Sequence, residues 1–406
     1  MKELRIGIIG TGVISNRHMN VWTKLPSVKV VAASDVDEKK LEAWGARHGI
    51  TDLYRDYRDL LARDDIDAVD VCVHNNLHTP LAIQVMKAGK HCYCEKPMAG
   101  SYADAKLMYD AQKAYGVKLA IQISSIMTKQ AYIAREAVAS GKLGNIYHMR
   151  SVGHRRKGRP GLDMPLSPDF YSGKLAGHGA LFDMGVYHIS ALLFAAGIPE
   201  LESCYGSSYT GVEIDEALLA GRTFDVEDLG VGMAKYKGGL TFDIAESWAL
   251  NVDEIGSSFI AGSKGGLKFS GFDAYGGALA VDPARAMPVN IPDLSFYGHD
   301  EMGNMIDVAY NLGARRFAGL RGGNPEKDLL YFCNHVHWMA YLRGELTDET
   351  RYNTPWLALQ TMLVSEGIFL SGIHGRSLSK EEIEKMSVST ALKRQETDWG
   401  VLEFDF

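Results

Sequence analysis

Residues 182–189, FDMGVYHI, bring three proton-carrying side chains close together. Asp183 is followed four residues later by Tyr187 and five later by His188. The apolar residues around them predict a helix over 181–195. At about 100° per residue, Tyr187 would lie about 40° from Asp183 around the helix axis, and His188 about 140° away. We therefore expect Asp183 and Tyr187 to share one helix face, while His188 points sideways.

A fourth reactive group is Lys96, in the segment Glu95-Lys96-Pro97. Acid–base chemistry on a hydroxyl group needs a base that takes the proton. A lysine ammonium beside the oxygen stabilises the developing alkoxide. A tyrosine next to that cation is able to take the proton near neutral pH. We favour Tyr187 as the proton carrier. His188 or Lys96 alone are the alternatives, and a hydrogen bond in the packing between helix and sheet is the other interpretation of His188.

A glycine-rich turn at residues 10–15, GTGVIS, follows the first predicted strand and opens a helix. In a dinucleotide fingerprint the first glycine makes the tight turn, and the second lets a pyrophosphate approach the helix N-terminus. Ser15 stands at the third position, where a small residue suffices for packing. Asp35 ends the second predicted strand, where a carboxylate accepts the ribose hydroxyls and repels a 2′-phosphate. The pattern therefore favours NAD over NADP.

The elements that must position these residues alternate in the first part of the chain. We expect strands over 4–10, 28–35, 67–73, 90–95 and 117–123, and helices over 13–25, 37–49, 79–89 and 101–116. This order indicates a doubly wound parallel sheet, a Rossmann domain over residues 1–124. From residue 125 to 406, runs typical of antiparallel strands are followed by helices, which indicates an α+β domain with an open, mainly antiparallel sheet. Glycine pairs at 238–239 and 265–266 suit hairpin turns.

Polar segments also follow the third and fourth strands, as HNNLH at 74–78 and EKP at 95–97. Ligands of doubly wound sheets bind at these strand ends. The residues that we expect to contact the cofactor are Gly10, Gly12, Val13, Ile14, Asp35, His74, Asn75, Asn76, His78, Glu95, Lys96 and Gln122.

Substrate contacts are expected from the basic segment GHRRKGRP at 153–160, in which residues 154 and 156 face one side of a strand and 155 and 157 the other. A solvated edge or a salt bridge between subunits is the alternative. Trp248 could stack on a sugar ring or pack in the core. The candidates for substrate binding are His154, Arg155, Arg156, His178 and His188. We expect no metal site, because Cys92 with Cys94 and His335 with His337 supply too few converging ligands for zinc.

The composition narrows the function classes. The chain has 406 residues with a net charge of −7, 46% hydrophobic and 23% charged residues, which offers no general affinity for nucleic acid or anionic lipid. We find no stretch near the roughly 18 apolar residues of a membrane span. Five cysteines, an odd number in apolar runs, favour reduced thiols and a cytoplasmic protein.

Together these segments resemble the Gfo/Idh/MocA family of nicotinamide-dependent oxidoreductases, in particular its glucose–fructose oxidoreductase and glycoside 3-dehydrogenase branches. The matching segments are residues 10–15, Asp35, 74–78, 95–97 and 179–190 (GALFDMGVYHIS). The resemblance implies a Rossmann domain followed by a large open antiparallel sheet, one face of which forms oligomer contacts, as a dimer or a tetramer. It also implies hydride transfer between a sugar or cyclitol and NAD.

The resemblance assigns roles to three residues. The lysine that matches Lys96 binds the reacting oxygen, and the aspartate that matches Asp183 completes the site with the residue four positions later. Many members carry histidine there, whereas this chain has Tyr187.

Three functions compete. The first is an NAD-dependent dehydrogenase of a sugar or glycoside, with C3 of a pyranoside as the specific expectation. The second is a redox-assisted glycosidase, in which oxidation, elimination and re-reduction release an aglycone without net redox change. The third is a non-catalytic NAD sensor.

Overall fold

The computed structural model describes residues 3–269, 294–310, 330–331 and 333–406. The chain forms two compact units. The first contains residues 1–122, 335–359 and 388–406, and the second contains residues 123–334 and 360–387. The first unit thus includes two segments that the sequence analysis assigned to the C-terminal domain. The division into domains at residue 124 stays a prediction.

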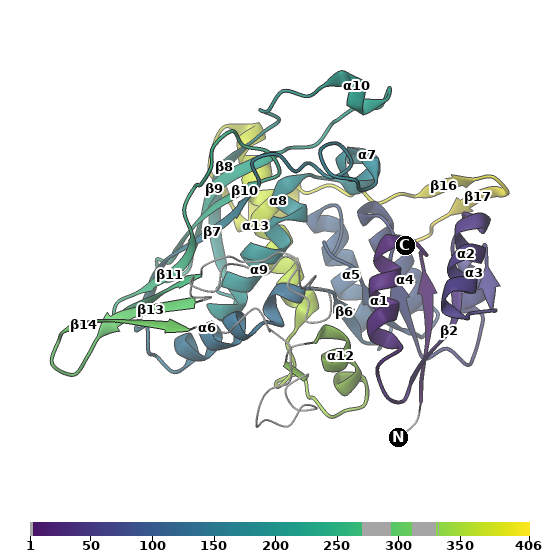
Figure 1. The fold of residues 1–406 in the computed structure, drawn as a ribbon, viewed down its shortest axis with the longest axis horizontal. Coiled ribbons are helices and arrows are strands. Elements are labelled where there is room, and N and C mark those ends of the chain that lie inside the picture. The colour runs from purple at the N-terminus through teal and green to yellow at the C-terminus, as the bar shows by residue number, and fades with distance from the viewer. Residues whose placement is uncertain (1–2, 270–293, 311–329, 332) are drawn as a thin grey trace. The chain divides into compact units, whose positions relative to one another are not determined.

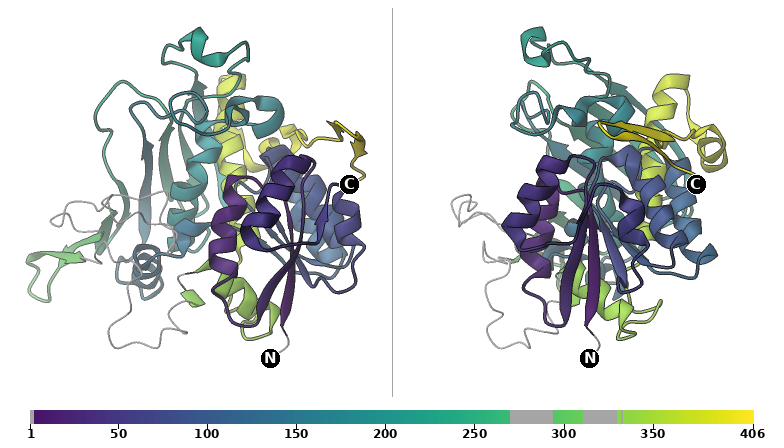
Figure 2. Two further views of the ribbon diagram at one scale, coloured as in Figure 1. Left: turned by 45° about the vertical axis from the view of Figure 1, so that its right-hand side comes forward. Right: turned by 90° about the vertical axis from the view of Figure 1, so that its right-hand side faces the viewer.

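The first unit is built on a six-stranded parallel sheet in the order β3-β2-β1-β4-β5-β6. Figure 2 shows these strands side by side with helices on both faces. The prediction of a doubly wound parallel sheet is therefore confirmed. The strands are β1 (Leu4–Ile9), β2 (Val28–Ser34), β3 (Leu53–Tyr54), β4 (Ala68–Val71), β5 (His91–Cys94) and β6 (Leu119–Ile121).

Capping residues mark the ends of two helices of this unit. Asp37 and Ser101 accept hydrogen bonds from the backbone N–H of Lys40 and Asp104, and Gly49 ends a helix in the left-handed conformation. The helices are α1 (Val13–Trp22), α2 (Glu38–His48), α3 (Tyr57–Leu61), α4 (Asn75–Lys87), α5 (Tyr102–Ala114) and α12 (Asn334–Leu342). A two-stranded ribbon follows, β16 (Arg394–Thr397) with β17 (Gly400–Glu403).

Two expectations for this unit were wrong. The sequence analysis missed β3 and α3, which are too short to show a clear period. It also began the fourth helix at residue 79, whereas α4 begins at Asn75. The residues HNNLH are therefore the cap and first turn of this helix rather than a loop.

The second unit is built on a nine-stranded sheet in the order β14-β13-β12-β11-β7-β10-β9-β8-β15. Among the described strands of this sheet only β7 and β10 pair in parallel, so the mainly antiparallel sheet is confirmed. The strands are β7 (Ile146–His154), β8 (Leu201–Tyr209), β9 (Leu229–Tyr236), β10 (Thr241–Ser247), β11 (Ser258–Gly262), β12 (Gly265–Phe269), β13 (Leu294–His299), β14 (Met305–Tyr310) and β15 (Leu378–Ser379).

Gly238 and Gly239, both at positive φ, make the expected turn between β9 and β10. The second expected glycine turn was wrong, because Gly265 and Gly266 pair within β12.

Helices cover one face of this sheet (Figure 1). The sheet backbone at Gly206 and Gly232 lies close to the Ile368 side chain of α13. A Cβ at these two positions would lie 2.7 and 2.8 Å from that side chain, which is too close for a larger residue. The helices are α6 (Lys129–Ala139), α7 (Gly173–Ala176), α8 (Ala180–Asp183), α9 (Gly185–Ala195), α10 (Glu216–Leu219), α13 (Thr354–His374) and α14 (Lys380–Met386), with single 3₁₀ turns at Ser124–Ile126 and Pro168–Tyr171.

The statement that no stretch is long and apolar enough to span a membrane was also wrong. Among the described helices, α13 meets that test by length and composition, but 72% of its most apolar window is buried inside the structure. Burial of that kind is typical of a core helix.

Candidate active site

The glycine-rich turn connects β1 to α1 in a conformation that only glycine allows. Gly10 has φ +93°, and a Cβ there would overlap the carbonyl oxygen of Cys72. Gly12 caps α1 without a side-chain hydrogen bond, and a Cβ on it would meet no atom within 4 Å. Val13, the first helical residue, is 73% exposed. The helix N-terminus is thus open to a phosphate group.

Ser15 explains how this chain replaces the third glycine. Its buried hydroxyl donates to the carbonyl oxygen of Gly12 at 2.6 Å and accepts from Nε1 of Trp44 at 2.9 Å. A small polar residue therefore ties α1 to α2 where a glycine would only permit close packing.

Asp35 lies beside this turn, just beyond the end of β2. Its Oδ2 accepts hydrogen bonds from the backbone N–H of Thr11 at 2.7 Å and from the Thr11 hydroxyl at 2.9 Å, and its Oδ1 accepts from the N–H of Asp37 at 3.0 Å. A half-exposed carboxylate fixed next to an open helix N-terminus fits the ribose end of NAD. The residues present therefore fit this cofactor.

The HNNLH residues divide into two groups. His74 caps α4 and is exposed, and Asn75 is half-buried on the first turn of the helix. Asn76 and His78 are buried: Asn76 accepts from the Thr390 hydroxyl at 2.7 Å, and the ring nitrogens of His78 lie 2.8 and 3.1 Å from backbone carbonyl oxygens. Burial lowers the pKa of His78. All four residues remain predicted cofactor contacts.

The EKP segment follows β5 and is held in place by hydrogen bonds of Glu95. Glu95 is buried, its Oε1 lies 2.7 Å from Nε2 of His18, and its Oε2 accepts from the backbone N–H of Lys96 at 3.0 Å. Lys96 itself is half-buried. Gln122, just after β6, accepts a hydrogen bond from the Tyr93 hydroxyl.

In the second unit, the expected single helix over 181–195 is two helices, α8 and α9, joined at Met184. The N–H of Tyr187 bonds to the carbonyl oxygen of Met184, three residues back rather than four. The count of 100° per residue therefore does not carry across this joint, and the angles expected for Tyr187 and His188 do not apply.

Both Asp183 and His188 contact side chains at the end of β10. Oδ2 of Asp183 accepts from Nε1 of Trp248 at 3.1 Å, and Nδ1 of His188 lies 2.8 Å from Oε2 of Glu246. A Cβ at Gly153 would overlap both His188 and Glu246, so this glycine makes room for the pair. Trp248 is fully buried, which confirms its core-packing interpretation. Tyr187 is half-buried.

His188 is thus held between helix and sheet, as its alternative interpretation stated. Lys96 lies in the first unit, whereas Asp183 and Tyr187 lie in the second. Their convergence in one active site stays a prediction.

The basic segment after β7 is more internal than expected. His154 alternates with Gly153 and so faces away from α9; its Nε2 is buried without a hydrogen-bond partner in the structure, and burial lowers its pKa. Arg155 donates to the carbonyl oxygen of Gly158, and exposed Arg156 pairs with Asp253 at 3.0 Å. Arg159, which we did not single out, is buried and bonds to Asp163.

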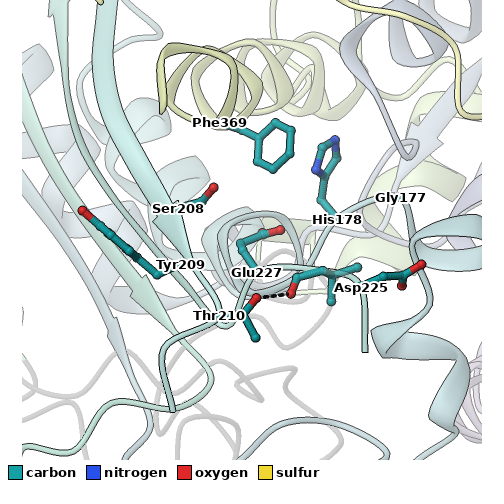
Figure 3. Close-up of a pocket in the computed structure, with 9 residues that line it drawn as sticks. Gly177, His178, Ser208, Tyr209, Thr210, Asp225, Glu227 and Phe369 are labelled. Carbon is teal, nitrogen blue, oxygen red and sulfur yellow. Dashed lines mark hydrogen bonds between the residues drawn. The ribbon is translucent and has the colours of Figure 1, made fainter. Parts of the chain in front are cut away.

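His178 lines a cavity of about 340 Å³ together with Ser208, Tyr209, Asp225 and Glu227 (Figure 3). Its ring stacks on Phe182, with ring centres 4.0 Å apart. Burial lowers the pKa of His178 to about 3, so the imidazole is neutral and able to accept a hydrogen bond.

The sequence analysis named only His178 among the residues that line this cavity, and it missed the buried carboxylate of Glu227. Its carboxylate accepts from the backbone N–H of Gly179 at 2.9 Å and of Leu181 at 3.1 Å, at the start of α8. Burial raises the pKa of Glu227 to about 7. The signal in the sequence was a charged pair, Glu227-Asp228, directly before an apolar strand.

One group of metal-ligand side chains occurs among the described residues. His18, Asp70 and His335 are buried and place ligand atoms within 4.8 Å of one another. Both ring nitrogens of His18 already face carboxylate oxygens at 2.7 and 2.9 Å, so neither has a lone pair for a cation. We therefore interpret the group as a hydrogen-bonded network.

Comparison with known proteins decides the family. A model of an oxidoreductase family with an NAD-binding Rossmann fold matches residues 4–123, and a model of the Gfo/Idh/MocA C-terminal domain matches residues 133–268. Together they cover more than half of the chain. This protein belongs to the Gfo/Idh/MocA family of oxidoreductases. Its first unit is an NAD-binding domain, and the expected cofactor is confirmed.

Its relatives include sugar dehydrogenases. The chain is 28% identical to D-glucoside 3-dehydrogenase of Escherichia coli over 257 residues, which are 62% of this chain and 72% of that protein. It is 29% identical to levoglucosan dehydrogenase of Pseudarthrobacter phenanthrenivorans over 206 residues, which are 48% of this chain and 52% of the relative. The second alignment thus spans about half of that relative's length.

Solved structures agree in fold. Levoglucosan dehydrogenase in complex with NADH has a TM-score of 0.73 at 19% identity, covering 93% of this chain and 98% of that one. An oxidoreductase domain protein from Kribbella flavida has a TM-score of 0.73 at 22% identity, covering 93% and 99%.

Proposed function

We propose that this protein oxidises a secondary alcohol of a sugar or glycoside with NAD, with C3 of a pyranoside as the reacting carbon. The observation that carries the proposal is the similarity to D-glucoside 3-dehydrogenase, which extends over 62% of the chain. The presence of Lys96, Asp183 and Tyr187 at the positions that resemble the family's site supports a catalytic protein over a sensor.

Bound NAD supplies the hydride acceptor. In the proposed site, Gly10, Gly12 and Asp35 hold the cofactor's pyrophosphate and ribose. Lys96 holds the substrate oxygen with its ammonium group and stabilises the alkoxide. The backbone of Lys96 is fixed by a hydrogen bond of 3.0 Å from its N–H to the carboxylate of Glu95.

Tyr187 takes the hydroxyl proton in this proposal, and Asp183 orients the reacting groups. Asp183 suits an orienting role because the Trp248 indole holds one of its oxygens in a buried position. His188 suits a structural role because Glu246 occupies its Nδ1.

Substrate recognition is proposed to involve His154, Arg155, Arg156 and His178. His178 is the best supported of these, because a neutral imidazole on a cavity wall beside Tyr209 and Glu227 offers a polar contact for sugar hydroxyls. His154 offers a buried ring nitrogen that has no partner in the structure.

We also propose that the protein acts in the cytoplasm as a homo-oligomer. Tyr205 and Met233 pair across β8 and β9 on one face of the nine-stranded sheet, and their side chains are 57% and 47% exposed. Large apolar side chains gathered on one sheet face favour contact with a second copy. Light scattering of the purified protein should give a dimer or a tetramer, and Met233→Lys should weaken that assembly.

The test is a screen of the purified protein with NAD against monosaccharides and glycosides, following NADH absorbance and aglycone release together. NADH formation in step with substrate loss supports the dehydrogenase. Aglycone release without NADH supports the redox-assisted glycosidase. Binding of NAD with neither product supports the sensor.

A further inference from the structure

The core of the first unit contains a row of acid, imidazole and acid that the proposed mechanism does not use. Nδ1 of His18, on α1, lies 2.9 Å from Oδ2 of Asp70 on β4. Nε2 of the same ring lies 2.7 Å from Oε1 of Glu95, directly after β5. All three side chains are less than 9% exposed. We call these residues the buried triad.

The net charge of the buried triad follows from counting protons. Each of the two short contacts between nitrogen and oxygen needs one proton in it, because two lone pairs would repel each other. Two protons shared among two carboxylates and one imidazole leave one negative charge, whichever group holds each proton. Burial lowers the pKa of His18, but the charges and hydrogen bonds of Asp70 and Cys72 together outweigh burial, so the pKa lies well above its usual value.

The neighbours that the structure shows around the buried triad are neutral. Asp70 accepts from Nε1 of Trp22 at 2.7 Å, and the Cys72 thiol lies 3.4 Å from its other oxygen. Burial raises the pKa of Cys72, so the thiol keeps its proton. The ring of His335 packs 5.0 Å from His18, and burial lowers its pKa well below the usual value.

The position of the buried triad relates it to the cofactor. Asp70 is the next-to-last residue of β4, and Glu95 directly follows β5. The strand order places the switch point of the sheet between β1 and β4. Dinucleotides bind outside the carboxyl ends of strands at such a point. The nicotinamide ring is positive in NAD⁺ and neutral in NADH, and Lys96 adds a second cation next to Glu95 in the chain.

We propose that the buried triad is an electrostatic element that favours oxidised over reduced cofactor. One negative charge in a low-dielectric interior offsets the repulsion between NAD⁺ and the lysine ammonium, and it offers nothing to NADH. The proposal rests on the proposed placement of Lys96 beside the cofactor, but its test measures cofactor binding without a sugar, so its failure is distinguishable from failure of the proposed reaction.

The test is the double variant Asp70→Asn/Glu95→Gln. The amides match the carboxylates in shape and keep oxygens that accept from Trp22 and from the Lys96 N–H, while His18 keeps one proton, so the charge goes to zero. We expect the dissociation constant of NAD⁺ to rise about 10-fold relative to that of NADH, because a unit charge in a protein interior acts over several ångströms at an effective dielectric constant of about 20. Titrations followed by protein and NADH fluorescence give both constants.

Two control variants separate charge from structure. Trp22→Phe removes a hydrogen bond to Asp70 without removing charge, and Asp59→Asn removes an exposed charge that water screens. Both should leave the ratio of the two constants unchanged. An unchanged ratio in the double variant, or the same shift in Trp22→Phe, would overturn the proposal.

The unaltered protein provides a second measurement that needs no variant to fold. We expect it to bind NAD⁺ at least as tightly as NADH. Binding of NADH ten times more tightly than NAD⁺ would contradict a site biased toward the oxidised form.

Discussion

The indole Nε1 of Trp248 donates a 3.1 Å hydrogen bond to Oδ2 of Asp183, in a place where the indole is fully buried. Two positions before Trp248 in the chain, Glu246 holds His188 in the same way. The end of β10 therefore fixes two of the three polar side chains of the FDMGVYHI segment. Tyr187 is the member of that segment that we assign to proton transfer.

Replacing Trp248 by Phe should lower the free energy of unfolding and the rate of NAD reduction. The phenyl ring fills most of the same space, but buried Asp183 loses a donor, which costs about 1–3 kcal/mol. Urea unfolding measures the loss of stability, and the initial rate of NAD reduction measures the effect on the proposed orienting role. Wild-type stability together with a wild-type rate would show that this hydrogen bond matters to neither.

Tyr187→Phe and His188→Asn separate the two candidates for proton carrier. Loss of the phenol should lower kcat by at least about 100-fold, the usual scale of acid–base catalysis. His188→Asn should mainly lower stability, because Glu246 loses its 2.8 Å contact in the core. A collapse of kcat in His188→Asn beside a nearly normal Tyr187→Phe would reverse the assignment.

Asp35→Asn should relax the preference for NAD over NADP. The amide keeps an oxygen for the Thr11 N–H but loses the charge that repels a 2′-phosphate. We expect the affinity for NAD to fall about 10-fold, because charge-assisted hydrogen bonds to the ribose become neutral ones, and the affinity for NADP to rise. Dissociation constants for both nucleotides test this, and an unchanged ratio would remove Asp35 from the ribose site.

Glu227 predicts a specific dependence of stability on pH. Because burial raises its pKa from 4.5 to about 7, its contribution is fully present below pH 4.5 and is lost as the pH rises through 7. Urea unfolding at pH 5 and pH 8, compared between the wild type and Glu227→Gln, should show a difference of about 3 kcal/mol at most between the two pH values. An identical pH dependence in both proteins would contradict a raised pKa.

Much of the fold followed from local patterns. The GTGVIS turn between the first strand and helix, the position of Asp35 after the second strand and the helices that begin near residues 37 and 101 depend on residues close in sequence, and the structure has each of these elements. The parallel sheet followed from alternating elements of ordinary length.

The wrong predictions of helix boundaries arose where contacts or breaks that the local pattern does not show determine the ends of a helix. Helix α4 starts early because His74 caps it and its first turn packs against the C-terminal segment through Asn76 and Thr390. The break between α8 and α9 at Met184 invalidates the expected angles between Asp183, Tyr187 and His188, which assumed one continuous helix.

The contacts of the buried triad and of Glu227 could not be predicted from the sequence, because their partners are distant in the chain. His18, Asp70 and Glu95 are far apart in the chain and meet only once the sheet has formed. Glu227 finds its two backbone donors almost 50 residues upstream.

The most direct test of the proposed function is the fate of a deuterium placed at C3 of a methyl glucoside. The protein is incubated with NAD and the labelled glycoside, and the reduced cofactor is analysed by mass spectrometry, with Lys96→Ala as the matched control. We predict reduced cofactor one mass unit heavier in the wild type, and none in Lys96→Ala, although that variant still binds NAD. Unlabelled NADH from the wild type, or no reduction at all, would contradict oxidation at C3.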